Sequence, residues 1–287
     1  MLTNHHTHCE FCDGQTSAHD MAEAARDAGF SILGFSSHAP LPFGTDWNMD
    51  GSRLGAYLAT IRTLAAEHAS PRAGIPAMGI LVGLEIDFIE GLCGPADGRF
   101  REARLDYSIG SVHYVSPEGP PTVGFTVDEP EDDFAAHLES FYDGDADALV
   151  EDYYAAVAAC VRAGGFDILG HLDLVRKNNG GKSRFREDTG RYRAAAMQVV
   201  DALAGTGIIV EVNTGGMARG KTDSPYPALW IAKELNARCI AVCVNSDAHQ
   251  GNQLLANRDD GLRLAREAGY RKLTVVGMDG RRELPLE

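Results

Sequence analysis

Short apolar segments alternate with longer amphipathic segments along most of the chain. The apolar segments show little alternation of polar and apolar positions, which is typical of strands that are buried on both faces of a parallel sheet. We predict seven such strands, with residues 272–276 as a candidate eighth strand. Their ranges are 2–6, 31–38, 79–88, 107–115, 166–174, 207–214 and 239–247.

The amphipathic segments between these strands predict helices. Ser17 is followed by Asp20 in the pattern of a capping box, apolar residues then recur at helical spacing, and Gly29 is placed to end this helix. Further helices are predicted at 54–69, 146–161, 192–203, 228–235 and 262–268. Strands that alternate with helices predict an α/β barrel, and we expect residues 1–287 to form one domain.

Two segments interrupt this alternation. Residues 39–51 are rich in Pro, Gly and aromatic side chains, and residues 116–147 contain four prolines and a run of acidic residues. We predict that both are long loops at the carboxyl ends of strands, where such barrels build their substrate sites.

Histidine and acidic side chains stand at or near the ends of the predicted strands. His6 and His8 are two residues apart, so in a strand both side chains point to the same face. The carboxyl ends of all strands in a parallel barrel lie at one rim, so the other members of the set should meet them there. Imidazole and carboxylate groups are ligands of zinc, manganese and iron, and the pattern predicts a metal site. These other members are His38, Glu85, His113, His171, Asp247 and His249.

Each of these residues also has an ordinary structural interpretation. A single His113 or His171 is more often a hydrogen-bonded core residue, and Asp247 alone suits a helix cap. Their shared position at strand ends favours the metal site. Of the remaining histidines, His19 and His68 are predicted on helix surfaces, and the sequence assigns no role to His5 and His137.

Composition narrows the class of protein. The chain has 287 residues, 44% of them hydrophobic, and no apolar segment long enough to span a membrane, so we expect a soluble cytoplasmic protein without a membrane partner. A formal net charge of −15 argues against broad nucleic-acid binding. Six cysteines without an export signal predict free thiols. Cys9 and Cys12 form a C-x-x-C pair, for which ordinary packing is favoured over redox chemistry, and Cys239 and Cys243 are expected in the core.

The motifs resemble the ordered signature of the polymerase and histidinol phosphatase (PHP) superfamily. The segments around His113 and His171, with the long insertion between them, are most similar to the monofunctional histidinol-phosphatase branch. The resemblance runs from residue 2 to about residue 270 and implies a distorted (β/α)7 TIM-like barrel with a trinuclear metal site. The motifs are His6-Thr7-His8, Ser37-His38-Ala39-Pro40, Gly83-Leu84-Glu85, Gly110-Ser111-Val112-His113-Tyr114, Gly170-His171-Leu172-Asp173, Val212-Asn213-Thr214 and Ser246-Asp247-Ala248-His249.

The resemblance also implies how three divalent cations (Zn, Mn or Fe) are held. Many histidinol phosphatases have a histidine where this chain has Gly14, and Asp13 matches the Asp of other superfamily members. The implied ligands are His6, His8, Glu85 and Asp247 for the first metal, Glu85, His113 and His171 for the second, and Asp13, His38 and His249 for the third.

A phosphate monoester carries two negative charges, so its hydrolysis needs cations that neutralise the phosphate and activate water. The implied catalytic residues are Glu85, Asp247 and His249, either of the last two relaying a proton, and the general acid is left unassigned. Basic residues follow the fifth and sixth strands, and Arg176 and Arg219 are the predicted phosphate ligands, although a solvated basic loop is the alternative for each. The other basic residues there are Lys177, Lys182, Arg184, Arg186 and Lys221.

The resemblance favours hydrolysis of L-histidinol phosphate in histidine biosynthesis. The alternatives are another PHP phosphoesterase acting on nucleotides, cyclic phosphates or other alcohol phosphates, and a non-catalytic metal-binding module, which an open rim disfavours. A further set of acidic residues could meet the substrate ammonium or be solvated loop acids: Glu129, Glu131, Asp132 and Asp133.

Overall fold

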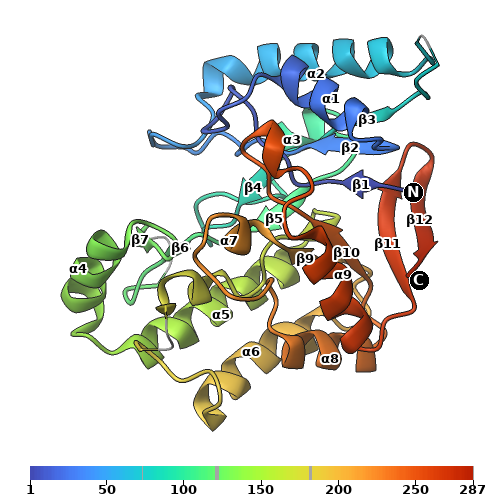
Figure 1. Cartoon of the computed structure of the whole chain (residues 1–287). Helices are drawn as coiled ribbons and strands as arrows, with labels where there is room; N and C mark the ends of the chain where they lie inside the picture. Colours follow the sequence, from blue (N-terminus) through green and yellow to red (C-terminus); the bar gives the residue numbers. More distant parts are fainter. Residues whose placement is uncertain (73, 120–122, 181–182, 287) are drawn as a thin grey trace.

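The computed structural model describes residues 1–72, 74–119, 123–180 and 183–286 (Figure 1). Lys182 and part of the predicted loop 116–147 lie outside these residues. Two parallel sheets form the centre. One has the order β1-β2-β3 and the other the order β10-β9-β8-β5-β4. Their strands are β1 (Thr3–Asn4), β2 (Ile32–Phe35), β3 (Gly79–Val82), β4 (Glu85–Asp87), β5 (Ile109–Ser111), β8 (Ile168–Leu169), β9 (Ile209–Asn213) and β10 (Val242–Asn245).

The predicted strand 79–88 is split into β3 and β4, and the split joins the two sheets. At the break, a Cβ on Gly83 would lie 2.5 Å from the Tyr107 ring, so only glycine fits this close approach. β3 pairs with β2, β4 pairs with β5, and His38 forms a parallel bridge with Glu85 beyond the end of β2. The seven parallel strand paths therefore follow one another as in a distorted TIM-like barrel.

The first and last paths, those of β1 and β10, meet at a seam. Along the described residues the backbone there forms one parallel bridge, Thr7 with Ala248, and no continuous ladder. The His8 amide donates to the Ala248 carbonyl at 2.8 Å, and the Ala248 amide donates to the His6 carbonyl at 3.2 Å. The seam thus lies directly beside His6, His8 and Asp247.

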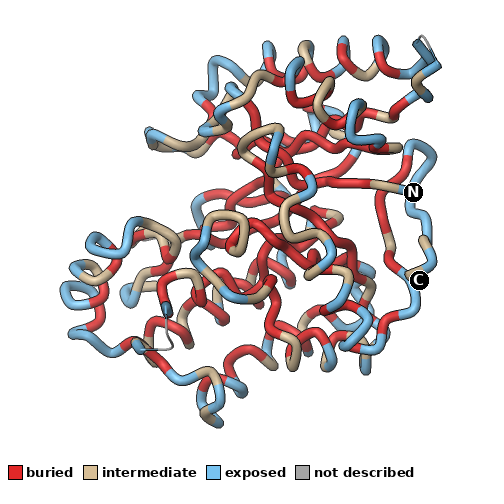
Figure 2. Tube along the Cα trace, viewed as in Figure 1, coloured by how far each residue is buried: buried red, intermediate tan, exposed pale blue. Residues whose placement is uncertain are grey.

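Helices surround the strands on the outside (Figure 1), and the buried residues concentrate between helices and strands (Figure 2). The Ser17 hydroxyl accepts a hydrogen bond from the Asp20 amide at 3.0 Å, which confirms the predicted N-cap. The last long helix begins at Arg258, earlier than predicted. The helices that follow strands are α1 (Ala18–Asp27), α2 (Leu54–His68), α5 (Ala146–Ala163), α6 (Gly190–Leu203), α8 (Leu229–Ala237) and α9 (Arg258–Glu267), and the shorter ones are α3 (Gly98–Glu102), α7 (Gly215–Ala218), η1 (Gly51–Arg53), η2 (Leu174–Asn178) and η4 (Gly251–Gln253).

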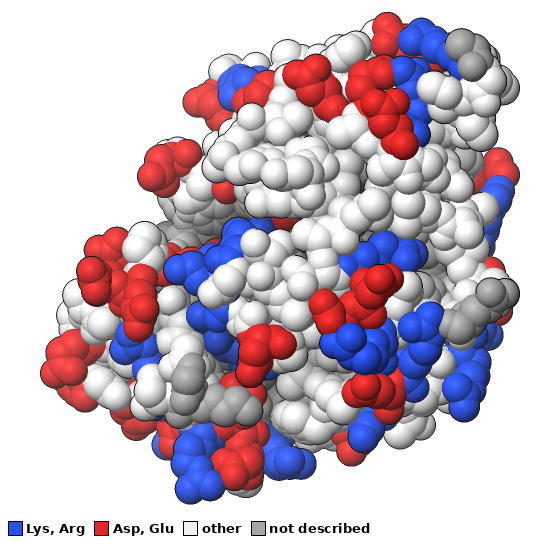
Figure 3. All heavy atoms as spheres, viewed as in Figure 1, with Lys and Arg blue, Asp and Glu red and all other residues white. Residues whose placement is uncertain are grey.

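The prediction of one long loop at 116–147 is wrong. The segment contributes β7 (Phe125–Thr126), which pairs with β6 (Tyr114–Val115), and the helix α4 (Glu131–Tyr142). The acidic run that suggested a loop fills the first turn of α4, where negative charge favours the helix dipole. Phe134, Leu138 and Tyr142 recur at a spacing of four and bury one face of α4, while its acidic side chains gather on the surface (Figure 3).

The candidate eighth strand is not part of the barrel. Residues 272–277 form β11 (Lys272–Gly277), which pairs with β12 (Gly280–Pro285) in an antiparallel hairpin. Val275 and Val276 of this hairpin pack in one apolar cluster with Ile109, Ile168 and Ile209 from inside the barrel. The His5 ring donates through Nε2 to the Val276 carbonyl at 2.8 Å. The hairpin therefore covers the amino-terminal end of the barrel.

Two further sequence predictions need correction. His68 is 2% exposed and lies inside the protein, with Nδ1 donating to the Leu64 carbonyl at 2.9 Å and Nε2 3.3 Å from a Glu23 oxygen. Cys239 is exposed in a turn with a positive φ of 56°, whereas Cys243 is buried as expected. In the described part of the chain, every helix is too short or too polar to cross a membrane.

Candidate metal centre

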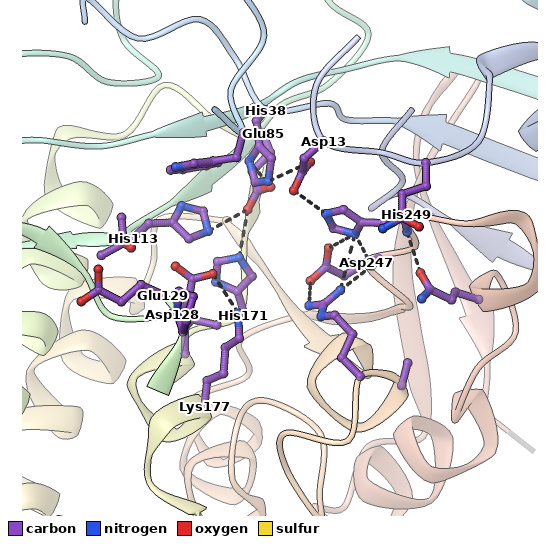
Figure 4. Close-up of a pocket in the computed structure, with 18 of the residues that line it drawn as sticks. Asp13, His38, Glu85, His113, Asp128, Glu129, His171, Lys177, Asp247 and His249 are labelled. Atoms are coloured by element: carbon purple, nitrogen blue, oxygen red, sulfur yellow. Dashed lines mark hydrogen bonds and ion pairs between the residues drawn. The ribbon is translucent and has the colours of Figure 1, made fainter. Parts of the chain in front are cut away.

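A pocket of about 810 Å³ opens at the carboxyl ends of the strands (Figure 4). His6 and His8 lie beneath its floor, and both are fully buried. The structure therefore brings all nine predicted metal ligands into one region. The seven that line the pocket are Asp13, His38, Glu85, His113, His171, Asp247 and His249.

Four ligand atoms form a compact first cluster. The Nε2 atom of His6 lies 3.0 Å from Glu85 Oε2 and 3.6 Å from Asp247 Oδ1. The Nε2 atom of His8 lies 3.4 Å and 3.3 Å from the same two oxygens. Four ligands placed tetrahedrally at about 2.1 Å from a zinc ion are about 3.4 Å apart. The four atoms are therefore spaced as the ligands of one metal ion.

Three of these four atoms, and His38 Nδ1 at 3.0 Å from Glu85 Oε2, are buried polar atoms without a hydrogen bond among the residues that the structure describes. The three are Nε2 of His6, Nε2 of His8 and Oε2 of Glu85. A buried polar group without a partner destabilises a protein, so such groups are rare and need an explanation. A cation bound between them would satisfy them together, so the residues fit a metal ion.

Glu85 also faces a second cluster through its other oxygen. Its Oε1 atom lies 2.9 Å from His171 Nε2 and 3.8 Å from His113 Nε2, and it accepts a hydrogen bond from the Ser111 hydroxyl at 2.7 Å. Because Oε2 belongs to the first cluster and Oε1 to the second, the carboxylate has the geometry of a bridge between two metal ions.

A third cluster is more open. Oδ2 of Asp13 lies 3.3 Å from His249 Nε2, and Oδ1 lies 3.8 Å from His38 Nε2. The Asp13 side chain is 34% exposed, which leaves room for solvent or substrate beside it. A Cβ at Gly14 would lie 2.3 Å from the Cys9 amide nitrogen, so a side chain at that position has no space. This close approach explains why the acidic side chain comes from position 13 here.

Two carboxylates that the sequence analysis missed accept hydrogen bonds from the Nδ1 atoms of two proposed histidine ligands. His6 donates through Nδ1 to Glu211, at 2.9 Å from Oε2, and His113 donates through Nδ1 to Asp87 Oδ1 at 2.6 Å. Such hydrogen bonds fix the tautomer of a histidine and leave Nε2 for the metal. Asp87 stands two residues after Glu85 and so shares its face, and Glu211 is an acid in an apolar strand. Both signals were present in the sequence.

The electrostatics differ from one proposed ligand to the next. Although burial opposes it, acidic neighbours raise the pKa of His6, His38 and His113, so metal binding there would displace protons. Burial disfavours the charge of Glu85, but His6 and His38 hold its pKa well below the usual range. Burial, reinforced by His249 and His38, lowers the pKa of His8 to about 3. Glu85 is therefore ionised and His8 neutral at pH 7, as ligands of a divalent cation must be.

The C-x-x-C pair lies beside this cluster, and no disulfide joins its two cysteines in the structure. Cys12 Sγ is 3.5 Å from His8 Nδ1, and Cys9 Sγ is 3.3 Å from the Ser37 hydroxyl. Burial, together with the nearby Asp13, raises the pKa of Cys12 to about 11. A thiol that stays protonated is a poor nucleophile, so packing beside a metal ligand is favoured over redox chemistry.

The two arginines predicted to bind phosphate differ in position. Arg219 lines the pocket, is 28% exposed, and donates from Nη2 to Asp247 Oδ2 at 2.8 Å. Arg176 is outside the residues that line this pocket. It is 7% exposed and contacts Asp173 and Glu187, each at 3.3 Å. The neighbouring Lys177 reaches the pocket instead, with Nζ 3.1 Å from Asp128 Oδ2.

Comparison with protein families identifies the chain. A model of the PHP domain matches residues 4–215, which is most of the chain. The chain belongs to the PHP family. Two of the nine proposed ligands of this PHP protein, Asp247 and His249, lie beyond the matched segment, yet they reach the same pocket as the others.

Individual relatives extend the similarity over nearly the full length. The chain is 32% identical over 281 residues to the "Probable histidinol-phosphatase" of Deinococcus radiodurans, covering 95% of this chain and 96% of the relative. It is 25% identical over 268 residues to the "Histidinol-phosphatase" of Bacillus subtilis, covering 87% and 94%. The crystal structure of the histidinol phosphate phosphatase from Lactococcus lactis subsp. lactis Il1403, complexed with zinc, L-histidinol and phosphate, superposes with a TM-score of 0.66 at 19% identity and covers 96% of each chain. This last likeness establishes the PHP fold.

Proposed function

We propose that this PHP protein is a metal-dependent phosphomonoesterase that hydrolyses L-histidinol phosphate to L-histidinol and phosphate in histidine biosynthesis. The observation that carries the proposal is the set of buried nitrogen and oxygen atoms without hydrogen-bond partners among the described residues, on the floor of a pocket with an arginine at its side. The two relatives named as histidinol phosphatases support the choice of substrate.

Three divalent cations, zinc, manganese or iron, are part of this proposal. His6, His8, Glu85 and Asp247 would hold the first, Glu85, His113 and His171 the second, and Asp13, His38 and His249 the third. When bound, such cations lower the pKa of water toward about 7 and neutralise the charge on the phosphate oxygens. The zinc in the complex of the Lactococcus enzyme supports this assignment.

The protein's own groups would orient the ester. Arg219 is placed to donate to the phosphate, and its ion pair with Asp247 holds the guanidinium at the side of the pocket. His249 donates from Nδ1 to the Asp247 carbonyl at 3.1 Å, which orients the ring of that histidine. Asp247 and His249 are the proposed groups for proton transfer, because both line the pocket where the ester oxygen would leave.

We also propose that residues 1–287 act as one catalytic domain in the cytoplasm. The proposed ligands run from His6 to His249 and meet in one region, so the site needs most of the chain. All six cysteines are free thiols, which suits a reducing compartment.

The test is a measurement of phosphate release by the purified protein. L-Histidinol phosphate is compared with other monoesters, nucleotides and cyclic phosphates, after removal of metal by a chelator and after addition of zinc, manganese or iron. We expect hydrolysis of L-histidinol phosphate that is lost with the chelator and restored by metal. Faster hydrolysis of a nucleotide or a cyclic phosphate would contradict the proposed substrate.

A further inference from the structure

Glu129 lines the pocket, but the proposed hydrolysis of the phosphate ester gives its carboxylate no role. It stands between β7 and α4 and has a side chain that is 14% exposed. Figure 4 places it with Asp128 beside His113, across the pocket from His249 and Asp13. It therefore lies on the side of the second metal cluster and away from the third.

The Glu129 carboxylate is held in place by its neighbours. His137 of α4 donates from Nδ1 to Glu129 Oε1 at 2.7 Å, and the His137 ring packs on Phe125 at 5.2 Å between ring centres. The Asn178 side chain donates to the Glu129 carbonyl at 2.9 Å, which fixes the backbone. Oε2 of Glu129 has no hydrogen-bond partner within the described ranges. One carboxylate oxygen is thus positioned and left free for a ligand.

The other acidic groups on this side of the pocket are already neutralised or solvated. The carboxylate of Asp128 forms an ion pair with Lys177 at 3.1 Å. Burial disfavours the charge of Asp128, but Lys177 lowers the pKa of Asp128 to about 2. Asp46 lines the pocket but is exposed, so water screens its charge. Glu129 alone among these three combines partial burial with the absence of a described lysine or arginine partner.

A carboxylate in this position favours a cationic group on the ligand. A partly buried negative charge attracts a nearby cation much more strongly than the same charge in water. The pocket of about 810 Å³ is larger than a phosphate group requires, so it can also take the organic part of a monoester. Trp47 lines the same pocket and packs against His113 at 5.2 Å between ring centres, which adds an aromatic wall suited to a cation or a planar ring.

We propose that Glu129, positioned by His137, binds the ammonium group of the substrate and makes the enzyme selective for phosphate esters of amino alcohols. This inference rests on the proposed phosphatase function and assigns the residue that selects the alcohol.

The experiment compares two substrates that differ in one group. L-Histidinol phosphate carries the amine, and 3-(imidazol-4-yl)propyl phosphate lacks it but keeps the chain, the ring and the phosphate. A hydrogen bond to a charged group corresponds to a factor of about 10 to 150, so wild-type kcat/KM should be higher for the amine substrate by about that factor. Glu129→Gln should lower kcat/KM for the amine substrate by about 10- to 150-fold and for the other by less than about threefold.

Two further variants separate recognition from structure. Glu131→Gln is the matched control, because Glu131 is an exposed acid nearby that pairs with Arg184 at 3.0 Å, and it should leave both substrates unchanged. His137→Phe keeps the packing on Phe125 but removes the donor to Glu129. We expect it to lower kcat/KM for the amine substrate by about 3- to 10-fold, the effect of one ordinary hydrogen bond, and to spare the other substrate.

Each outcome decides between the proposals. A wild-type enzyme that hydrolyses both substrates equally well would keep the phosphatase function and overturn the role of Glu129. An equal loss on both substrates in Glu129→Gln would also overturn it, because it would indicate a structural effect. Hydrolysis of neither substrate by the metal-loaded wild type would refute the proposed function and this inference with it.

Discussion

The two ends of the barrel interior are built from opposite kinds of side chain on the same strands. At the amino-terminal end, Ile109, Ile168 and Ile209 pack with the β11 hairpin in an apolar cluster. At the carboxyl end, the same strand paths supply charged and polar groups that line the pocket or lie buried beneath it. These groups include Ser111, His113, His171, Glu211 and Asn213.

On strand β9 the change from apolar to polar side chains takes place within five residues. Ile209, Glu211 and Asn213 follow one another at a spacing of two, so they point to the same side of the strand, and all three are fully buried. A buried carboxylate destabilises the fold unless it is paired, whereas a buried isoleucine stabilises it. The apolar end therefore offsets the unfavourable burial of charge at the other end. Stability and chemistry should respond separately to mutation.

The largest expected effect comes from Glu85→Gln. The substitution keeps the size of the side chain but removes the negative charge that two metal ions would share, so bound metal should fall and kcat should drop by about 10³-fold or more. Elemental analysis and phosphate release are measured on the same sample, with circular dichroism to verify folding. Glu90→Gln, at an exposed position after the end of β4, is the control. Full metal occupancy with normal turnover would remove Glu85 from the bridging role.

Arg219→Met should have the next largest effect on activity. Loss of the charged donors should lower kcat/KM by about 10- to 150-fold, while metal content stays constant. Arg176→Met should behave differently, because it leaves Asp173 buried without its cation. We expect it to lower the free energy of unfolding by about 3 to 5 kcal/mol, measured by urea denaturation. A kinetic loss in Arg176→Met without a change in stability would argue against this distinction.

Glu211→Gln tests the support behind His6. The amide can still accept a hydrogen bond but lacks the charge that strengthens His6 as a ligand, so zinc affinity should fall by about 10- to 100-fold. Competition with a coloured chelator measures the affinity. Glu234→Gln on the surface of α8 removes an equal charge far from the strand ends and serves as the control. Equal affinities of the two variants would show that Glu211 is not needed for metal binding.

Ile209→Ala should have the smallest effect on activity and a clear effect on stability. Its side chain is fully buried, so truncation should lower the free energy of unfolding by about 2 to 5 kcal/mol. Metal stoichiometry and kcat should stay as in the wild type. Leu255→Ala, at a position that is 44% exposed, is the matched control. If Ile209→Ala lost metal, the two ends of the barrel would not be independent.

Much of the fold was predictable because its signals are local. Apolar segments placed the strands, and the Ser17 cap placed the start of α1. The nature of β11 was not predictable, because Lys272 to Gly277 has the same apolar pattern whether it pairs in the barrel or with β12. α4 was missed for a related reason. Its acidic first turn looks like a loop until Phe134 and Leu138 are seen to pack against the protein.

The metal ligands were predicted better than the residues around them. Ligand types and their positions at strand ends are visible in the sequence, and all nine predicted ligands meet around one pocket. The direction of a long side chain is not visible, so Arg176 and Lys177 could not be distinguished. They are adjacent in η2, and their side chains diverge, one toward Asp173 and the other into the pocket. The sequence named Glu129 only as one of four acids that could meet the substrate ammonium, and its choice over the other three required the position of α4.

The seam between β1 and β10 has a consequence for backbone dynamics. The backbone joins the two paths there by the Thr7–Ala248 bridge, while His6 and His8 on one side face Asp247 on the other. A cation bound by all three would hold the seam shut. At a free metal concentration of 100 times Kd, binding adds about 2.7 kcal/mol to the free energy of any opening that releases the ion. Amide hydrogens of His8 and Ala248 should then exchange with solvent deuterium about 100-fold more slowly. The bound metal would thus limit local opening of the barrel between β1 and β10.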